Sequence, residues 1–132
     1  MPAGEVFASL ALAEAVVAHL GREFEAVIAI GDCSPAASAL SSGYSRSPQM
    51  RALVGACGRS APRWLGVHVP REWNLDADRL SHPSGCGVVC DSIAGAGWTV
   101  CKLDPPKGLW SLLREVVRLP MGRDDLEWEV EP

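Results

Sequence analysis

The sequence predicts an α/β protein in which helices pack against at least one pair of parallel strands. Residues 25–31 and 64–69 are short apolar segments with the composition of buried strands, and helical patterns precede, separate and follow them. Because the connection between the two segments is long enough to hold helices, we expect the strands to run parallel. With 132 residues, 48% of them apolar, the chain has the size of one domain with one core.

The first expected element is a helix over residues 4–20. This stretch has no proline, its apolar side chains follow helical spacing, and Gly21 provides a stop signal. A helix that is apolar on nearly every face must be covered on most sides, so we expect it to pack against the sheet. Glu5 stands in the first turn, where the helix dipole favours an acidic side chain.

The first strand ends at Gly31 and is followed directly by Asp32. Two helices are expected between the strands, over residues 34–40 and 47–58, because each begins with a Ser-Pro pair typical of a helix start. The second of these helices carries an apolar stripe that points to the core.

The second strand, residues 64–69, is closed by Pro70. A further helix is expected to begin near Asp76, with Asn74 in the N-cap region and Pro83 ending the helix. Two strands are too few for a stable sheet, so we expect further strands, either from sequence upstream of Met1 or from a partner.

From residue 84 onward, glycines and a Pro-Pro pair predict a loosely structured extension. Within it, residues 109–119 are expected to form one amphipathic helix, and the final residues form an acidic tail. We therefore divide the chain into a domain over residues 1–83 and an extension over residues 84–132.

Charge is distributed unevenly along the chain, whose net charge is −4. Residues 33–71 contain five arginines and no acidic residue, whereas the last nine residues are rich in acids. Arginine forks suit phosphate oxygens, although a solvated basic helix face would have the same composition. No apolar run approaches the length of a membrane span, so we expect no membrane partner. No secretory signal is visible and the five cysteines have no regular spacing, so we expect reduced thiols and an intracellular location.

Asp32 and Asp78 each follow a predicted strand. The carboxyl ends of parallel strands meet at one edge of a sheet, and this edge is where α/β proteins build their sites. Carboxylate oxygens are preferred ligands of Mg²⁺, so one interpretation is that the two aspartates belong to a metal site. The other is that Asp32 is a turn residue and Asp78 an acid in the first turn of a helix.

The chain resembles the ribonuclease H domain of LTR- or DIRS-type retroelement reverse transcriptases. The matching pattern is a strand followed by Asp, then S-x₅-L-x₂-G-x-S, then H-V-P-x-E-x-N-x₂-A-D-x-L-S, of which the block from Asn to the last Ser is the most specific part. In this chain the matching residues are Asp32, Ser34, Leu40, Gly43, Ser45, His68, Val69, Pro70, Glu72, Asn74, Ala77, Asp78, Leu80 and Ser81.

The resemblance implies a mixed five-stranded sheet with helices on both faces and hydrolysis of the RNA strand of RNA–DNA hybrids. It assigns Glu5, Asp32 and Asp78 as catalytic residues that hold two Mg²⁺ or Mn²⁺ ions. In the family a first strand with a further aspartate precedes the helical glutamate, and this chain lacks the first three strands. We therefore expect an N-terminally truncated domain that is incomplete or inactive as it stands.

The same resemblance implies an RNA–DNA hybrid, and the rest of a reverse transcriptase polyprotein, as partners. Ser34, Arg46, Arg51 and Asn74 are the expected nucleic-acid-binding residues, with the arginines on phosphates rather than bases. His68, at a strand end, is expected to be structural.

Two other interpretations remain open. His82, Cys86, Cys90 and Cys101 could supply four zinc ligands, although their spacing fits zinc fingers poorly. Alternatively, the fold could be a non-catalytic nucleic-acid-binding or interaction remnant, whose open sheet edge would favour association.

Overall fold

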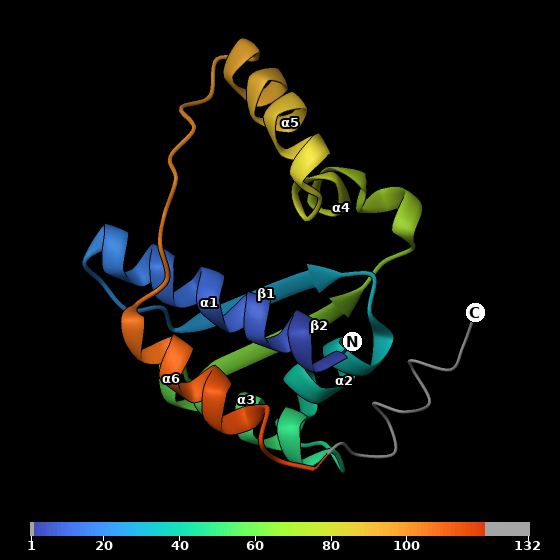
Figure 1. Cartoon of the computed structure of the whole chain (residues 1–132), viewed down its shortest axis with the longest axis vertical. Helices are drawn as coiled ribbons and strands as arrows, with labels where there is room; N and C mark the ends of the chain where they lie inside the picture. The colour runs from blue at the N-terminus through green and yellow to red at the C-terminus, as the bar shows by residue number, and fades with distance from the viewer. Residues whose placement is uncertain (1, 121–132) are drawn as a thin grey trace.

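The computed structural model describes residues 2–120 and has the expected mixed α/β organisation (Figure 1). The acidic tail lies outside the described residues. The helices and strands are, in chain order, α1 (Pro2–Leu20), β1 (Ala26–Gly31), α2 (Ser34–Ser42), α3 (Pro48–Ser60), β2 (Arg63–His68), the 3₁₀ turn η1 (Arg71–Trp73), α4 (Leu75–Leu80), α5 (Pro83–Gly95) and α6 (Lys107–Val116).

Strands β1 and β2 pair in parallel, as the sequence predicts. Their register places Ala26 opposite Arg63 and Gly31 opposite His68, and the Val69 N–H continues the ladder by donating to the Gly31 carbonyl at 2.9 Å. Both strands therefore end at the same edge of the sheet.

Helices α1, α2 and α3 gather on one face of this strand pair and form the hydrophobic core with it. The Trp64 side chain of β2 reaches α3, where its indole N–H donates to the Cys57 carbonyl at 2.7 Å. Helix α2 approaches β2 so closely that the Ser41 hydroxyl exchanges hydrogen bonds with both backbone groups of Gly66, at 2.8 and 3.1 Å. These contacts lock the two connecting helices against the strands.

The opposite face of the sheet is bare, and the expectation that residues 25–31 form a fully buried strand is wrong. Ile28 and Ile30 are each 63% exposed and Leu65 is 50% exposed, while the side chains between them pack against the helices. The described residues add no third strand, so β1 also has an unpaired edge. A hollow of about 340 Å³ lies beside β1, between it and the Leu12 and Val16 side of α1.

Of the two Ser-Pro helix starts between the strands, only the second caps its helix as predicted, because Ser34 is the first residue of α2 and the N-cap is Cys33, with no side-chain capping hydrogen bond. The Ser47 hydroxyl accepts from the Met50 N–H at 3.3 Å and starts α3. Gly43 ends α2 with a φ of +71°, in the left-handed region that glycine adopts readily, and its N–H donates to the Ala39 carbonyl at 2.8 Å. The sequence thus correctly located both helices.

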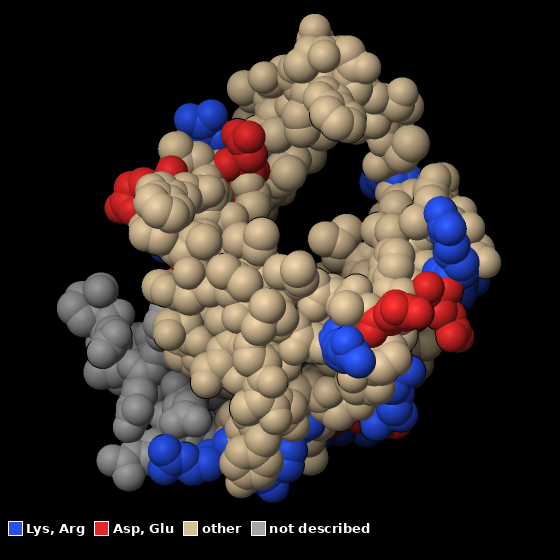
Figure 2. Space-filling model, turned by 180° about the vertical axis from the view of Figure 1, so that it is seen from behind, with Lys and Arg blue, Asp and Glu red and all other residues tan. Residues whose placement is uncertain are grey.

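The segment after β2 differs from expectation in two respects. Asn74 stands before α4, but its side chain makes no capping hydrogen bond. Pro83 begins α5 rather than only ending α4, so the glycine-rich stretch expected to be loose is helical. Helices α4 and α5 form an arm that stands away from the sheet, and the space-filling view shows an opening between this arm and the body (Figure 2).

Helix α6 agrees with the predicted amphipathic helix and returns the chain to the core. Its buried residues Leu109 and Val116 face α3, and the rings of Trp110 and Phe7 lie 6.0 Å apart. The Gln49 amide donates to the Leu119 carbonyl at 3.1 Å and fixes the end of this segment. The extension therefore contributes to the same core as the preceding residues.

Helix α1 is the single described helix long and apolar enough to cross a membrane by length and composition, so the expectation that no apolar run approaches the length of a membrane span is wrong for this segment. A soluble protein's core helix and a signal sequence meet the same conditions, and α1 buries part of its surface against the other helices. The expectation of no membrane partner stays a prediction.

Candidate active site

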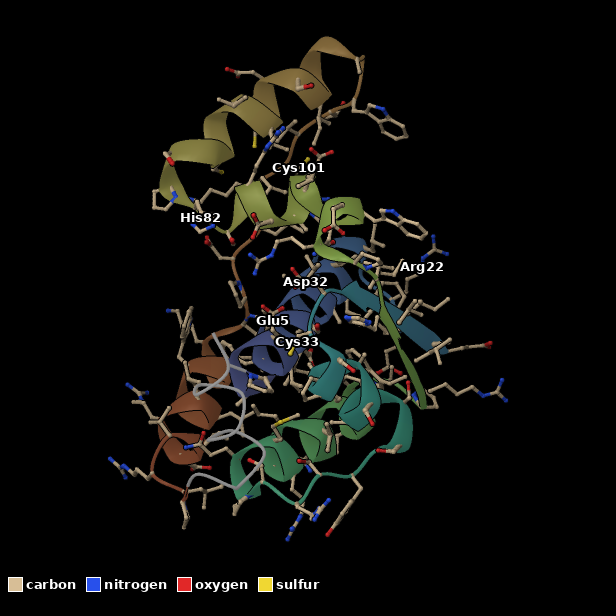
Figure 3. All side chains as sticks on the ribbon, turned by 90° about the vertical axis from the view of Figure 1, so that its right-hand side faces the viewer. Glu5, Arg22, Asp32, Cys33, His82 and Cys101 are labelled. Carbon is tan, nitrogen blue, oxygen red and sulfur yellow. The ribbon has the colours of Figure 1, made fainter. Side chains whose placement is uncertain are left out.

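The three acids singled out from the sequence line one open cleft of about 410 Å³ at the carboxyl edge of the strand pair. Glu5 comes from the first turn of α1, Asp32 directly follows β1, and Asp78 comes from α4. Figure 3 shows Glu5 and Asp32 on the same side of the molecule, below the α4–α5 arm. The other lining residues are Ala8, Ser9, Leu12, Ile30, Gly31, Asn74, Ala77, Leu80 and Ser81.

The chain connections explain why these residues meet. Helix α1 leads into β1 through a short turn at Gly21, whose φ is +69°, so the helix runs back along the strand and its first turn lies near the strand's end. On the other strand, Pro70 and η1 turn the chain immediately after β2 and bring α4 over the same edge. Residues from three parts of the sequence are therefore neighbours.

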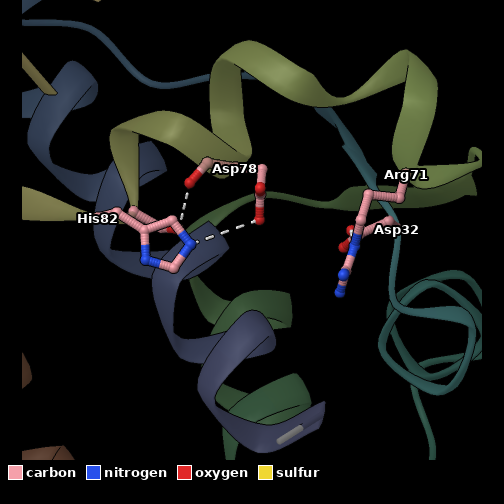
Figure 4. Close-up of polar contacts among 5 residues, drawn as sticks. Asp32, Arg71, Asp78 and His82 are labelled. Carbon is pink, nitrogen blue, oxygen red and sulfur yellow. Dashed lines mark hydrogen bonds and ion pairs between the residues drawn. The ribbon is translucent and has the colours of Figure 1, made fainter. Parts of the chain in front are cut away.

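Both aspartates of the cleft already have basic partners (Figure 4). The Arg71 Nε lies 3.5 Å from Asp32 Oδ2, and the His82 Nε2 lies 3.9 Å from Asp78 Oδ1. Asp32 is the better shielded carboxylate, with 22% of its side chain exposed against 38% for Asp78. Glu5 makes no ion pair with any other described residue.

This arrangement does not fit a formed metal site. The oxygen donors have the right chemistry for Mg²⁺ or Mn²⁺, and they share one cleft. However, within residues 2–120 no three His, Cys, Asp or Glu side chains converge closely enough to hold an ion, the proposed zinc ligands His82, Cys86, Cys90 and Cys101 included. Asp32 is instead paired with the guanidinium of Arg71.

Cys33 directly follows Asp32 and is close enough to Glu5 and Asp32 for both charges to act on its thiol. Burial raises the pKa of its thiol, the hydrogen bond with the Ala36 backbone opposes that increase, and the negative charges of Glu5 and Asp32 add to it. Burial likewise raises the pKa of Cys57, in the α3 core, to about 12. Both thiols therefore stay protonated at neutral pH, and all five cysteines of the chain are free.

The expected nucleic-acid-binding residues separate into two groups. Asn74 lines the cleft, and Ser34 is exposed at the first residue of α2, two positions after Asp32. Arg46 and Arg51 lie outside the cleft lining, on the α2–α3 loop and on α3.

Arg51 is engaged by the α2–α3 loop itself. Its guanidinium donates to the Ser45 carbonyl at 3.0 Å and lies 5.1 Å from the centre of the Tyr44 ring. These contacts hold the Arg51 side chain against the α2–α3 loop. A nucleic acid that binds Arg51 would therefore contact the loop surface and not the cleft.

Arg71 and His82 pair with the cleft aspartates, a role that the sequence analysis gave to neither, although it named His82 as a possible zinc ligand. Arg71 occupies the variable position of the H-V-P-x-E motif, so the motif gives it no weight. His82 lies four residues after Asp78, a spacing that was available in the sequence, although α4 ends at Leu80 and His82 is the residue just before α5.

Comparison of the chain with protein-family models, with curated proteins and with solved structures found no match. The fold and cleft define an α/β protein with a carboxylate-lined site at its strand ends. The resemblance to ribonuclease H domains stays a hypothesis that rests on the motif residues.

Proposed function

We propose that the chain is a ribonuclease H-like domain that binds RNA–DNA hybrids at the carboxylate cleft. The observation that carries the proposal is that Glu5, Asp32 and Asp78 line one cleft at the ends of two parallel strands. These residues lie 27 and 46 positions apart in the sequence, and the resemblance assigned them to one site. A structural role for each acid alone would not bring the three to a common edge.

We further propose that hydrolysis requires additional strands paired with the free edge of β1. The apolar strand segment Ala26–Gly31 has a single neighbour in the described sheet, and the hollow beside it is lined mainly by apolar side chains. A strand placed there would end beside Asp32 and could bring a further carboxylate to the cleft. In the chain as it stands, we expect hybrid binding with little or no cleavage.

The test is binding and cleavage of a labelled RNA–DNA hybrid, with Mg²⁺ or Mn²⁺, by the parent chain and two matched variants. Asp78→Asn removes a cleft carboxylate, whereas Asp76→Asn removes an exposed carboxylate on the same helix that does not line the cleft. If the chain cleaves, we expect Asp78→Asn to reduce the rate by about two orders of magnitude, as loss of one transition-state-stabilising group does. Asp76→Asn should behave like the parent. A parent that neither binds nor cleaves hybrid would contradict the proposal.

A second candidate function is hybrid binding without catalysis. It is favoured by the positions of Arg71 beside Asp32 and of His82 beside Asp78, which place a basic side chain next to two of the three cleft carboxylates. Binding through arginines to phosphates should weaken steeply with salt and show little sequence preference. A parent that binds hybrid in EDTA and never cleaves it, even when the upstream strands are supplied, would support this second function over the first.

A further inference from the structure

Cys86 and Cys90 form a pair of thiols on the α4–α5 arm, outside the lining of the carboxylate cleft. They stand four positions apart on α5, so both side chains lie on one face of the helix. Cys86 is exposed, Cys90 is half-buried, and both are free. Burial raises the pKa of the Cys90 thiol, and a hydrogen bond with the Cys86 thiol adds to this increase. The two sulfur atoms are therefore neighbours at the protein surface.

The separation of the two residues is close to that of a disulfide pair. Residues four apart in an α-helix have Cα atoms about 6 Å from each other, which is within the range found in disulfides. Their Cβ atoms are about 5–6 Å apart, whereas a disulfide needs roughly 4 Å. Bond formation therefore requires the helix backbone to move by about 1–2 Å between the two cysteines.

The start of α5 is suited to this movement. Gly87 lies between the two cysteines, and a glycine inside a helix makes that part of the helix less stable than an alanine would. No atom lies within 4 Å of the Gly87 Cβ position, so no neighbouring segment packs against the backbone there. Val89 is the single buried residue of α5, so few side-chain contacts resist a local opening of the helix.

We propose that Cys86 and Cys90 form a reversible redox site that reacts with low-molecular-weight disulfides. The exposed Cys86 sulfur, once deprotonated, attacks one sulfur of the reagent, which forms a mixed disulfide and releases one thiol. The Cys90 thiol then loses its proton and attacks the Cys86 sulfur, which forms the Cys86–Cys90 bond and releases the second thiol. Two protein thiols are oxidised and one reagent disulfide is reduced to two thiols, so no other oxidant is needed.

Reversibility follows from the position of the product. An exposed disulfide that distorts its helix is reduced more readily than a buried, unstrained one. The site therefore responds to the ratio of disulfide to thiol in its surroundings, and a return to thiol excess restores the regular helix. The proposal does not depend on hybrid binding at the cleft.

The experiment treats the full native chain with oxidised glutathione and records the intact mass and the peptide map over time. Cleavage before Asp91 separates Cys86 and Cys90 from Cys101. We expect the parent to gain and then lose one glutathione adduct, and to end with two hydrogens fewer on the peptide that holds Cys86 and Cys90. Cys90→Ser should stop at a stable adduct on Cys86, because the second thiol is absent.

Cys101→Ser is the control, since this exposed thiol lies outside α5, and the variant should form the Cys86–Cys90 bond as the parent does. Three results would overturn the inference: a stable adduct on the parent, a disulfide that includes Cys101, or no reaction of Cys86. Added reduced glutathione should return the oxidised parent to the free thiols, and a product that resists this reduction would also contradict the proposal.

Gly87→Ala tests the helix movement. Alanine stabilises the turn between the cysteines, so we expect conversion of the mixed disulfide to the internal disulfide to slow about two- to fivefold, with formation of the mixed disulfide unchanged. Gly95→Ala is the matched control, because Gly95 ends the same helix and also has no atom within 4 Å of its Cβ position. A Gly87→Ala rate equal to that of the parent, or equal slowing by both variants, would overturn the proposed route.

Discussion

At the scale of single residues, the pKa of the buried Cys33 thiol responds to the charges of the cleft carboxylates. Cys33 lies near Glu5 and Asp32, and both charges act on its pKa in the direction that burial already imposes. Cys57 lies in the same core but is influenced by Glu14 instead. The two buried cysteines therefore form an internal probe and an internal control.

We predict that Glu5→Gln lowers the pKa of Cys33 and accelerates its alkylation at fixed alkaline pH. A nearby negative charge disfavours the thiolate, so removing that charge increases the thiolate fraction. The increase should be modest, because burial is the largest cause of the raised pKa and is unchanged. The rate is measured over a pH series in a chain whose exposed or half-buried thiols, Cys86, Cys90 and Cys101, are replaced by serine.

Glu14→Gln is the matched control for this measurement, since it should leave Cys33 unaffected and act only on Cys57. Equal acceleration of Cys33 by both variants would mean that Glu5 has no special proximity to the thiol, and the described cleft would be wrong at that point.

At the scale of elements, the sequence predicted most of what is local. Ser-Pro starts, the Gly43 stop and the apolar stripes located the helices between the strands, because caps and periodicity act within a few residues. It failed at α5, where glycine was taken as a loop signal. Gly85 instead lies against the Arg79 backbone, with its Cβ position 2.6 Å from the Arg79 carbonyl oxygen, so glycine serves the close junction of α4 and α5.

The sequence predicted the acidic residues of the candidate site but not their basic partner Arg71. The acids Glu5, Asp32 and Asp78 were named from the sequence, and the structure places all three on one cleft. Arg71 could not be found in this way, because its role follows from the distance between two chain segments and not from a residue pattern.

The close approach of α2 to β2 leads to a prediction about Gly66. A Cβ at this position would lie 2.5 Å from the Ala37 Cα and closer still to its carbonyl oxygen, both of them backbone atoms that cannot rotate away. We expect Gly66→Ala to lower the free energy of unfolding by at least about 1–3 kcal/mol, the cost of overpacking a core.

Gly58→Ala is the control for Gly66→Ala. Gly58 is inside α3 with no atom within 4 Å of its Cβ position, so alanine should stabilise the helix by about 0.5–1 kcal/mol. Urea denaturation of both variants measures the difference. A Gly66→Ala variant as stable as the parent would show that α2 does not pack on β2 at this distance.

At the scale of the whole molecule, the fold is one-sided. Helices cover one face of the strand pair, whereas Ile28, Ile30 and Leu65 are exposed on the other. The sequence could not reveal this, because a β-branched strand has the same composition whether both faces or only one is covered. Burial depends on what packs against the strand, and residues 2–120 supply a cover for one face alone.

We predict that the bare face makes the parent chain self-associate, and that Ile28→Lys reduces this association. Strand β1 has an unpaired edge and contains neither a charge nor a proline, the features that usually protect edge strands. A lysine at Ile28, opposite Leu65 on the exposed face, adds charge where the side chain is already 63% exposed, so the fold should tolerate it.

Val88→Lys is the control, because Val88 is equally exposed at 65% but lies on α5, away from the sheet. Light scattering over a concentration series should show less association for Ile28→Lys alone; equal effects of both variants would assign the association to net charge and not to the sheet.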